Sequence, residues 1–407
     1  MGVIRVCTEY LLPGMILAKK IPGVDGGILL ESGTLLGDEQ ITLLKQVGFP
    51  AAYVRLPVDM DFESEAMRQA ERHVRNFFIY VDPDHEALKR LFSIAVKRTA
   101  EAVLSGWEMP CESALRAKNV EHLADEFIKD VDNAAQIVRH EVGLASFPDI
   151  YFKIREILDN PKSSARDIAD VVNTDVGFSA KLLKLVNSPF FGFTAKVDSV
   201  SRAVSLVGAQ EISTLALGIS TINYFKNIPP ELMDMRTFWR HSLRCAVFAK
   251  LISAKLKLPS ERHFTAGLLH DVGRLIIFKN MAYASVEALL LARSDMVPLV
   301  EAESTILDYN HAEVGELLLA EWGFPKALKD LIGHHHDPEK AASRREAAII
   351  QLADIMANVA EISTGGMYAL PGMTQEDWNL LELDERFLSQ LMSMHDAHFE
   401  EITAVLL

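Results

Sequence analysis

The chain has 407 residues, of which 49% are hydrophobic and 24% are charged. These are ordinary values for a globular protein, so a disordered, collagenous or low-complexity chain is excluded. At about 150 residues per domain, we expect two or three domains. The formal net charge is -15 at pH 7. A surface this acidic repels phosphate backbones and anionic lipids, and we therefore predict neither a nucleic-acid nor a membrane partner.

The three cysteines, Cys7, Cys111 and Cys245, lie far apart in the sequence. An odd number at such spacing argues against a disulfide framework and against a zinc site built on thiolates, and it fits a reducing compartment. The N-terminus has no signal-peptide pattern, and no segment reaches the roughly 18 uninterrupted apolar residues that a membrane span requires. We therefore expect a soluble, cytoplasmic protein.

Residues 1–58 predict a small α+β module. Two short apolar runs, 16–18 and 28–30, are separated by positions rich in glycine and proline, which indicates a hairpin. Apolar side chains at helical spacing predict a helix over 38–47, and 51–54 is the expected closing strand.

Residues 59–142 predict long helices. The segment is charged and poor in glycine, and apolar side chains such as Leu88, Leu91 and Ala95 recur at intervals of three and four residues. A helical linker fits this pattern, and so does a helical hairpin through which two copies of the chain form a homodimer.

The helical pattern continues over residues 143–407, so the predicted fold class is mainly α. Ser164 and Asp167 have the spacing of a capping box, and Pro189 ends the helix expected over 175–186. Further helices are expected over 201–208, 210–224, 237–256, 261–278, 283–293, 298–308, 311–321, 325–334, 344–362, 374–379 and 384–405.

Histidines cluster in this region. Seven of the 13 fall between residues 241 and 336, where an even distribution would place about three. His270 and Asp271 are adjacent and point about 100° apart on a helix, so both reach one metal ion only near a helix end, or if the carboxylate bridges two ions. Asp354 lies in an apolar helix, where an unpaired carboxylate is costly to bury.

Imidazole and carboxylate groups without thiolates suit manganese, iron or zinc. Two such ions close together can activate water and stabilise the charge that develops in phosphoester hydrolysis. The alternative is purely structural: a buried, hydrogen-bonded pair of His270 and Asp271, with the remaining histidines at helix caps or on the surface.

The order of these residues resembles the HD superfamily of metal-dependent phosphohydrolases, and within it the HD-related output domain (HDOD) and the HD-GYP cyclic-di-GMP phosphodiesterases. Residues 143–345 resemble HDOD most, in Phe147-Pro148, in Leu182 to Ser188, in Ala203 to Gly208 and in Trp322 to Pro325. Residues 1–57 are similar to the small module that precedes HD-GYP domains.

The resemblance implies one or two divalent ions of iron, manganese or zinc. The paired histidines of the family align with His335 and His336, because Asp337-Pro338 follows them as in HDOD, whereas a shift by one residue would pair His334 with His335. His263 has no counterpart and is expected at the surface or at a helix cap. The implied ligands are His241, His270, Asp271, His311, His335, His336 and Asp354.

The chain also departs from the HD-GYP pattern. The glutamate and the Gly-Tyr-Pro loop that follow the paired histidines in that family are missing. Arg274 stands where the family has a lysine, and arginine is a far poorer proton donor. Thr237 replaces a further glutamate, which argues against a third metal ion.

Three interpretations follow. The first is a cytoplasmic bacterial signalling protein whose HDOD domain is a metal-binding regulatory module, which contacts other signalling proteins through helices of 164–225. The second is a metal-dependent phosphodiesterase for a cyclic dinucleotide or nucleotide, in which the catalytic residues are Asp271, bridging two ions, and Arg274, holding a phosphate. The third is a helical scaffold without metal.

Overall fold

The structure is a computed structural model. It describes residues 3–23, 26–57, 61–111, 133–144, 164–209, 232–360 and 369–407, with a few single residues between 153 and 228. The fold is mainly α, as predicted, and the strands of the described residues all lie before residue 56. No helix in these ranges is long and apolar enough to cross a membrane.

The chain divides into two compact units. Unit 1 combines Met1–Ile79 with Phe92–Asn119, and unit 2 combines Tyr80–Leu91 with Val120–Leu407. The three-part division expected from the sequence, with boundaries after residues 58 and 142, stays a prediction.

Unit 1 contains an antiparallel sheet in the order β1-β5-β2. Strand β1 (Val3–Cys7) pairs with β5 (Ala51–Arg55) over its whole length, and β2 (Ile16–Leu17) pairs with the other edge of β5. Helix α1 (Asp38–Gln46) precedes β5 and ends before Gly48, whose φ of +67° is the left-handed conformation that glycine adopts readily. The helix and the closing strand predicted for this module are confirmed.

The hairpin of unit 1 differs from the prediction. Strand β4 (Ile28–Leu30) pairs with β3 (Ile21–Pro22), whereas β2 pairs with β5. Pairing of 16–18 with 28–30 is therefore wrong. The cause is the tight turn that Gly23 closes with a hydrogen bond to the carbonyl of Gly27 (2.9 Å), because this turn brings the immediately preceding residues opposite β4.

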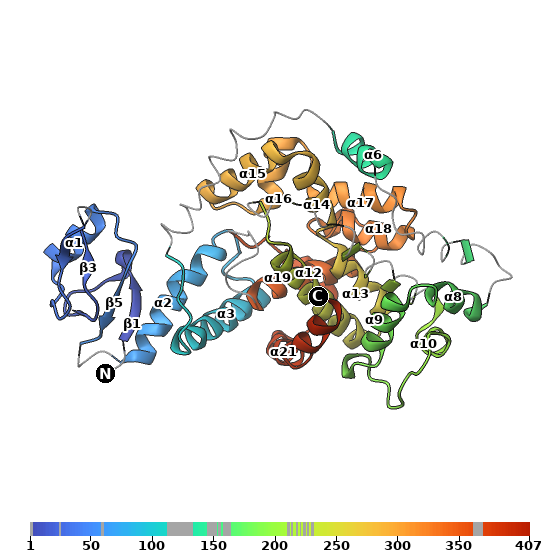
Figure 1. Cartoon of the computed structure of the whole chain (residues 1–407), viewed down its shortest axis with the longest axis horizontal. Helices are drawn as coiled ribbons and strands as arrows, with labels where there is room; N and C mark the ends of the chain where they lie inside the picture. The colour runs from blue at the N-terminus through green and yellow to red at the C-terminus, as the bar shows by residue number, and fades with distance from the viewer. Residues whose placement is uncertain are drawn as a thin grey trace. The chain divides into compact units, whose positions relative to one another are not determined.

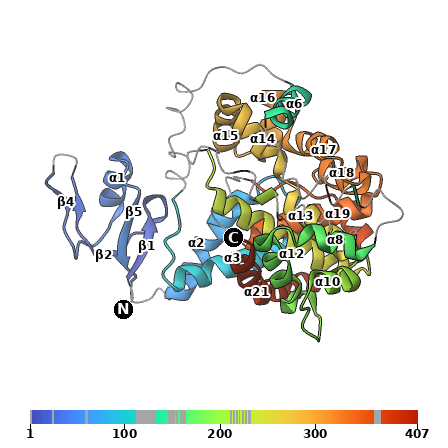
Figure 2. The ribbon, with the colours of Figure 1, turned by 45° about the vertical axis from the view of Figure 1, so that its right-hand side comes forward.

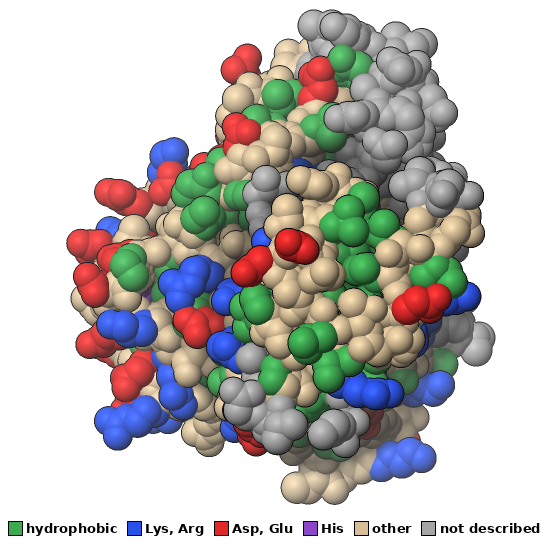
Figure 3. Space-filling model, turned by 90° about the vertical axis from the view of Figure 1, so that its left-hand side faces the viewer, with side chains coloured by type: hydrophobic (Ala, Val, Ile, Leu, Met, Phe, Trp, Pro, Cys, Tyr) green, Lys and Arg blue, Asp and Glu red, His purple; other side chains and the backbone are tan. Residues whose placement is uncertain are grey.

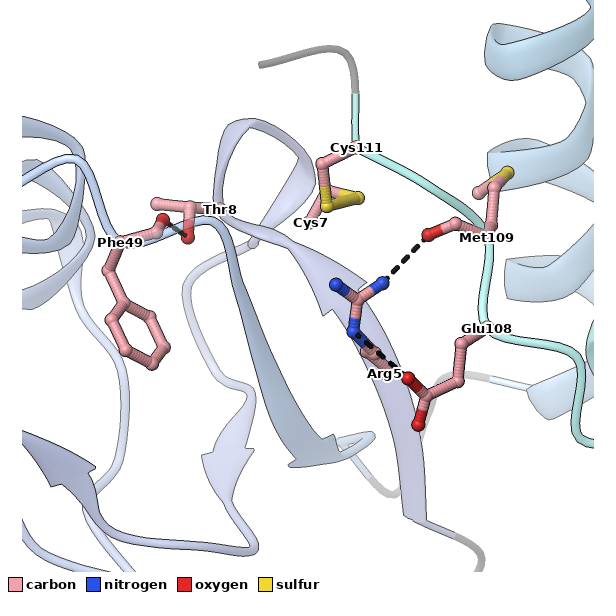
Figure 4. The surroundings of a disulfide bond; sticks show 7 residues. All are labelled: Arg5, Cys7, Thr8, Phe49, Glu108, Met109 and Cys111. Carbon is pink, nitrogen blue, oxygen red and sulfur yellow. Dashed lines mark hydrogen bonds and ion pairs between the residues drawn. A yellow bond between two sulfur atoms is a disulfide. The ribbon is translucent and has the colours of Figure 1, made fainter. Parts of the chain in front are cut away.

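A disulfide joins Cys7 to Cys111, so the expectation of unpaired cysteines is wrong for these two. Cys7 ends β1, and Cys111 lies shortly after α3 (Glu86–Leu104). Arg5 donates a hydrogen bond of 2.7 Å to the carbonyl of Met109, so the segment after α3 runs beside β1 (Figure 4). The two cysteines are 104 residues apart, and only the tertiary fold brings them together.

Unit 1 also contains a short 3-10 turn and a helix. A 3-10 turn, η1 (Thr8–Tyr10), follows β1, and α2 (Phe62–Phe77) begins with Asp61 as its N-cap.

On the face drawn in Figure 3, hydrophobic side chains lie between acidic and basic ones. The exposed apolar side chains of unit 1 include Val3, Ile28, Leu35 and Val47.

Three helices form the centre of unit 2. They are α12 (Met235–Lys255), α13 (Ser260–Leu269) and α19 (Arg344–Ala360), which pack against one another (Figures 1 and 2). Most side chains of α12 and α19 are buried, so a polar side chain on either helix is costly unless it has a partner.

The other helices surround this centre. Helix α14 (Val272–Asn280) packs on α17 (His311–Glu321), α17 on α18 (Lys326–Gly333), and α6 (Ala134–Leu144) on both α14 and α17. The remaining elements are α8 (Ala165–Val172), α9 (Val176–Val186), η2 (Pro189–Phe191), α10 (Val200–Val207), α15 (Ala282–Asp295), α16 (Leu299–Leu307), η3 (Pro338–Lys340), α20 (Gln375–Leu381) and α21 (Glu385–Leu406).

Most predicted helices of unit 2 are confirmed to within about two residues. The capping box at Ser164 and Asp167 is present, with a backbone-to-carboxylate bond of 2.7 Å. The expected single helix over 261–278 is wrong, because the chain leaves the helix at Asp271 and begins α14 at Val272. The helix expected over 210–224 and the Phe147-Pro148 motif lie largely outside the described residues.

Candidate metal centre

Five segments of unit 2 deliver the seven side chains expected as ligands. Helix α12 carries His241, α17 begins at His311, and α19 carries Asp354. His270 and Asp271 occupy the break between α13 and α14, so the two adjacent side chains can diverge toward different neighbours. The turn that follows α18 supplies the last two, His335 and His336.

The ligand atoms gather into two groups. Asp271, His311, His335 and His336 form one, and His241, His270 and Asp354 form the other, with the ligand atoms of each group within 4.8 Å of one another. All these residues are buried except His336, which is partly exposed. The sequence prediction thus placed all seven residues in one cluster, and their role as metal ligands remains to be tested.

Asp271 lies between the two groups. Its Oδ1 is 3.1 Å from Nε2 of His311, and its Oδ2 is 3.5 Å from Nε2 of His270. Within the second group, Oδ1 of Asp354 is 3.1 Å from Nε2 of His241 and 3.6 Å from Nε2 of His270. The two oxygens of Asp271 therefore face different groups, which is the arrangement of a carboxylate that could bridge two cations.

The histidine rings are oriented with Nε2 toward the centre of the cluster. Nδ1 of His270 bonds to the carbonyl of Gly267 (2.8 Å), and Nδ1 of His335 to that of Ile332 (2.7 Å). When the rings are neutral, these bonds keep the proton on Nδ1 and leave the electron pair on Nε2. Nε2 of both rings is buried without a hydrogen-bond partner. Unpartnered buried nitrogens of this kind fit a divalent ion, which would satisfy them.

Two glycines let the helices that carry the cluster residues pack closely. A Cβ on Gly273 would lie 2.0 Å from the carbonyl oxygen of His311, and one on Gly267 would lie 2.8 Å from backbone atoms of Cys245 and Ala246. Glycine at these two positions lets α14 approach α17 and lets α13 approach α12. Asp271 and His270 reach their neighbours because no side chain separates the backbones.

The charge states of the cluster favour metal ligation. Burial opposes ionisation of both aspartates, but Arg274 and neighbouring histidines hold the pKa of Asp271 well below its usual value, and His241 and His270 do the same for the pKa of Asp354. Burial lowers the pKa of His335 to about 3, so this imidazole is neutral at pH 7. Ionised carboxylates and neutral imidazoles are the forms that bind metal ions.

Two histidines show the opposite shift. Burial disfavours their protonated forms, but the charge of Asp271 raises the pKa of His270 well above its usual value, and the charge of Glu303 raises the pKa of His311. Protons on these rings balance the buried carboxylates, and an incoming cation would take over that balance. Burial raises the pKa of the Cys245 thiol, so this free cysteine beside His270 stays protonated rather than becoming a thiolate ligand.

Arg274 lies at the edge of the cluster, and His334 and His263 lie outside it. Arg274 is only 4% exposed, and its Nη1 donates to Oδ2 of Asp271 at 2.9 Å. His334 lies outside the cluster, with Nδ1 bonded to the carbonyl of Asp330 (3.0 Å), so the cluster contains His335 and His336 rather than the pair shifted by one residue. His263 is fully buried against Glu346, and the expectation of a surface position is wrong.

Sequence reasoning missed Glu303. Its Oε2 accepts hydrogen bonds from the backbone N–H of His311 (3.0 Å) and from Nδ1 of the same ring (2.5 Å). Glu303 is 1% exposed on α16. The sequence signal is a glutamate among the apolar residues of a predicted helix, the same kind of signal that Asp354 gives.

The fold and this cluster define an all-helical domain of the HD type. Residues 144–338 match the model of the HDOD domain family. The chain therefore carries an HDOD domain, and the match includes every residue of the cluster except Asp354, which lies beyond its end.

Solved structures share this fold. The "Putative phosphohydrolase" of Shewanella amazonensis SB2B aligns with a TM-score of 0.54 at 21% identity, over 68% of this chain and 100% of that one. The "Putative signal transduction protein" of Marinobacter aquaeolei VT8 aligns with a TM-score of 0.51 at 20% identity, over 72% of this chain and 65% of that one. At these identities the likeness concerns the fold alone.

Two curated relatives match parts of the sequence. An uncharacterized protein of Treponema pallidum (strain Nichols) is 24% identical over 225 residues, which is 54% of this chain and 43% of the relative. Ribonuclease Y of Thermus thermophilus is 31% identical over 117 residues, which is 29% of this chain and 16% of the relative. The chain thus spans less than half the length of either relative.

Proposed function

We propose that the chain is a bacterial signal-transduction protein whose HDOD domain is a metal-binding regulatory module. The observation that carries this proposal is the set of seven converging side chains, in which Nε2 atoms of His270 and His335 are buried and unpartnered. Two such orphaned nitrogens beside ionised carboxylates are expensive to bury, and a divalent ion of iron, manganese or zinc would satisfy them. This argues against a scaffold without metal.

A regulatory role is favoured over hydrolysis by the burial of the cluster. His270, His311 and His335 are 0% exposed, and Asp271 is 2% exposed, so a phosphoester has little access to the ligand atoms. The arginine expected to hold a phosphate is itself buried and bonded to Asp271. A module that holds metal internally agrees with both observations, and we propose that α8, α9 and α10 are the helices that contact other signalling proteins.

The second candidate is a metal-dependent phosphohydrolase acting on a cyclic dinucleotide or nucleotide. The position of Asp271 between the two ligand groups favours it, since a bridging carboxylate could support two ions. Bound ions would supply water activation and stabilise the charge on the reacting phosphoester. In that case Asp271 would organise both groups, and Arg274 would have to leave Asp271 to contact a phosphate.

Metal analysis of the purified full chain tests the first proposal. We expect about one or two transition metal ions per chain by plasma mass spectrometry after loading with manganese, zinc or anaerobic Fe(II). Asp271→Asn combined with His335→Gln should abolish this content. His334→Gln is the matched control and should retain it, because His334 bonds outside the cluster.

Hydrolysis assays then separate the two candidates. Metal-loaded protein that leaves bis-p-nitrophenyl phosphate and cyclic dinucleotides intact supports the regulatory module. Cleavage that disappears in the Asp271→Asn variant supports the phosphohydrolase instead. Protein that binds no metal, with a normal melting temperature, would contradict both candidates and leave the helical scaffold.

We also propose that the chain forms a homodimer through helices of residues 59–142. The dimer proposal is supported by the length of α2 and α3, and by the exposed side chains of Met67, Ile79 and Leu104 on or next to these helices. Light scattering on the full chain measures it directly. A monomer at micromolar concentration would rule it out.

A further inference from the structure

We infer that Arg274 takes the place of a second cation, so that the centre holds one tightly bound divalent ion in the group of Asp271, His311, His335 and His336. This inference rests on the proposed metal-binding function and specifies how that site is filled. Because of Arg274, the group of His241, His270 and Asp354 binds an ion weakly.

The position of Arg274 is the first support. Its Nη1 lies 2.9 Å from Oδ2 of Asp271, the oxygen that faces His270 at 3.5 Å and His241 at 4.0 Å. This is the oxygen that the three-residue group would need as a fourth ligand. A guanidinium is always charged in proteins, so it both occupies this oxygen and repels a cation placed beside it.

Arg274 is also held in place. It is 4% exposed, it lies one helical turn after Asp271, and its Nε is 3.8 Å from Oε1 of Glu303. Glu303 in turn bonds to His311, so its negative charge lies beside both the guanidinium and a ligand histidine. A guanidinium that is buried and paired in this way would have to give up its contact with Asp271 before an ion could take its place.

Apart from the effect of Arg274, the two groups also differ in the number of ligands that they offer. The group around Asp271 offers four ligands, whereas the other group offers three. In the four-ligand group, the Nε2 atoms of His311 and His336 lie 3.0 Å apart, within hydrogen-bond distance, so both nitrogens face the same point. The first ion should therefore enter between them.

The charge balance gives the same stoichiometry. Histidines bind an ion only as neutral imidazoles, and in that state Asp271, Asp354 and Glu303 oppose a single guanidinium, which leaves the buried cluster a net charge of −2 for the ion to neutralise. One divalent ion neutralises this charge. A second ion would leave an excess of buried positive charge, which a low-dielectric interior disfavours strongly.

Metal stoichiometry in the full chain tests the inference. The metal-free protein is titrated with Mn²⁺, bound metal is counted after dialysis, and the electron paramagnetic resonance spectrum distinguishes an isolated ion from a coupled pair. We expect one tight ion with the spectrum of an isolated centre in the unmodified protein. In Arg274→Gln, which keeps a hydrogen-bond donor without the charge, we expect a second ion to bind about tenfold tighter or more.

Two further variants make the result specific. Arg274→Lys keeps the positive charge and should retain one tight ion. Arg344→Gln removes an arginine that pairs with Asp377 at 2.7 Å at the start of α19, and it should not change the stoichiometry. Thermal melting of each variant shows whether it has folded.

The possible failures are distinguishable. If the unmodified protein binds no ion, the proposed function fails and this inference fails with it. If it binds two ions tightly and gives a coupled spectrum, the inference is overturned while the metal-binding function stands, even if Arg274→Gln does not fold. A second affinity that is unchanged in folded Arg274→Gln overturns it as well.

Discussion

Glu303 controls the orientation of His311 although it is not itself expected to bind an ion. Its Oε2 accepts from both the backbone N–H and Nδ1 of His311, which turns Nε2 toward Asp271. A carboxylate behind a ligand histidine fixes the tautomer and makes the imidazole a stronger donor. Glu303 is therefore a positioning residue of the proposed centre.

We expect Glu303→Gln to weaken metal binding by about tenfold or more, because an uncharged amide polarises the His311 ring less than a carboxylate does. The readout is the dissociation constant for Zn²⁺, together with the ¹⁵N shifts of the His311 ring in metal-free protein. Glu301→Gln is the matched control, since Glu301 lies exposed on the same helix. Equal affinities for the two variants would contradict the role of Glu303.

Burial of the charged side chain of Lys250 lowers the stability of the folded state. It is 7% exposed on α12, lies 3.5 Å from Glu261 and sits over the ring of Phe191 at 3.3 Å. Burial lowers the pKa of Lys250 to about 8 despite the opposing charge of Glu261. The unfolded chain has the ordinary lysine pKa of about 10.4, so the folded state binds its proton less tightly.

The sign of the pH dependence follows from this difference. Below pH 8 both states are protonated and the full cost of the buried charge is present. Between about pH 8 and 10.4 the unfolded state binds more protons, so the contribution of Lys250 to the free energy of unfolding rises with pH. We expect Lys250→Met to raise the free energy of unfolding at pH 7 by at most about 3 kcal/mol.

Urea unfolding at pH 7 and pH 10 measures this effect. The advantage of Lys250→Met over the unmodified chain should shrink toward pH 10. Lys255→Met, at an exposed position on the same helix, should change neither value by more than about 0.5 kcal/mol. A Lys250→Met chain that is less stable at pH 7 would show that the contacts with Glu261 and Phe191 outweigh the burial cost.

At the scale of elements, the contact of α14 with α17 decides whether the two ligand groups meet. Gly273 faces the carbonyl oxygen of His311, and a Cβ there would lie 2.0 Å from that oxygen and 2.5 Å from the backbone nitrogen of Gly315. These are backbone atoms that cannot rotate away. A side chain at this position must push the helices apart.

We expect Gly273→Ala to lower the free energy of unfolding by about 2 kcal/mol or more and to weaken metal binding, because Asp271 moves away from His311. Chemical denaturation and metal titration of the same sample measure both effects. Gly372→Ala is the control, since a Cβ there meets nothing within 4 Å, and it should be close to neutral. A Gly273→Ala chain with unchanged affinity would show that α14 and α17 adjust without separating Asp271 from His311.

The same helices show what the sequence could and could not predict. Helix α17 begins at His311 as expected, because Asn310 caps it locally. At the break between α13 and α14, Asp271 stands at the N-cap position before Val272, but its carboxylate makes no cap hydrogen bond and instead contacts Arg274 and His311. The grouping of the seven cluster residues could be predicted because their order along the chain matches a known motif. The roles of Glu303, Lys250 and the Cys7–Cys111 pair could not, because they depend on contacts between distant segments.

For the whole molecule, the two compact units carry different stabilising devices. Unit 1 contains the disulfide, which closes a loop of 104 residues, and unit 2 contains the proposed metal centre. A cross-link over a loop of this length stabilises by about 4 kcal/mol in the chain-entropy model, since it restricts the unfolded state. A bound ion stabilises the unit that holds it by mass action.

The full chain should therefore respond separately to a reductant and to a chelator. We expect reduction, or Cys7→Ala with Cys111→Ala, to lower the melting temperature of one calorimetric transition, and chelation of the metal-loaded protein to lower that of another. Alkylation under denaturing conditions should label one cysteine without reductant, Cys245, and all three with it. Three labelled cysteines in unreduced protein would show that the disulfide does not form. A single transition shifted by both treatments would instead show that the two units unfold together, in which case metal binding in unit 2 and the disulfide in unit 1 would stabilise one cooperative molecule.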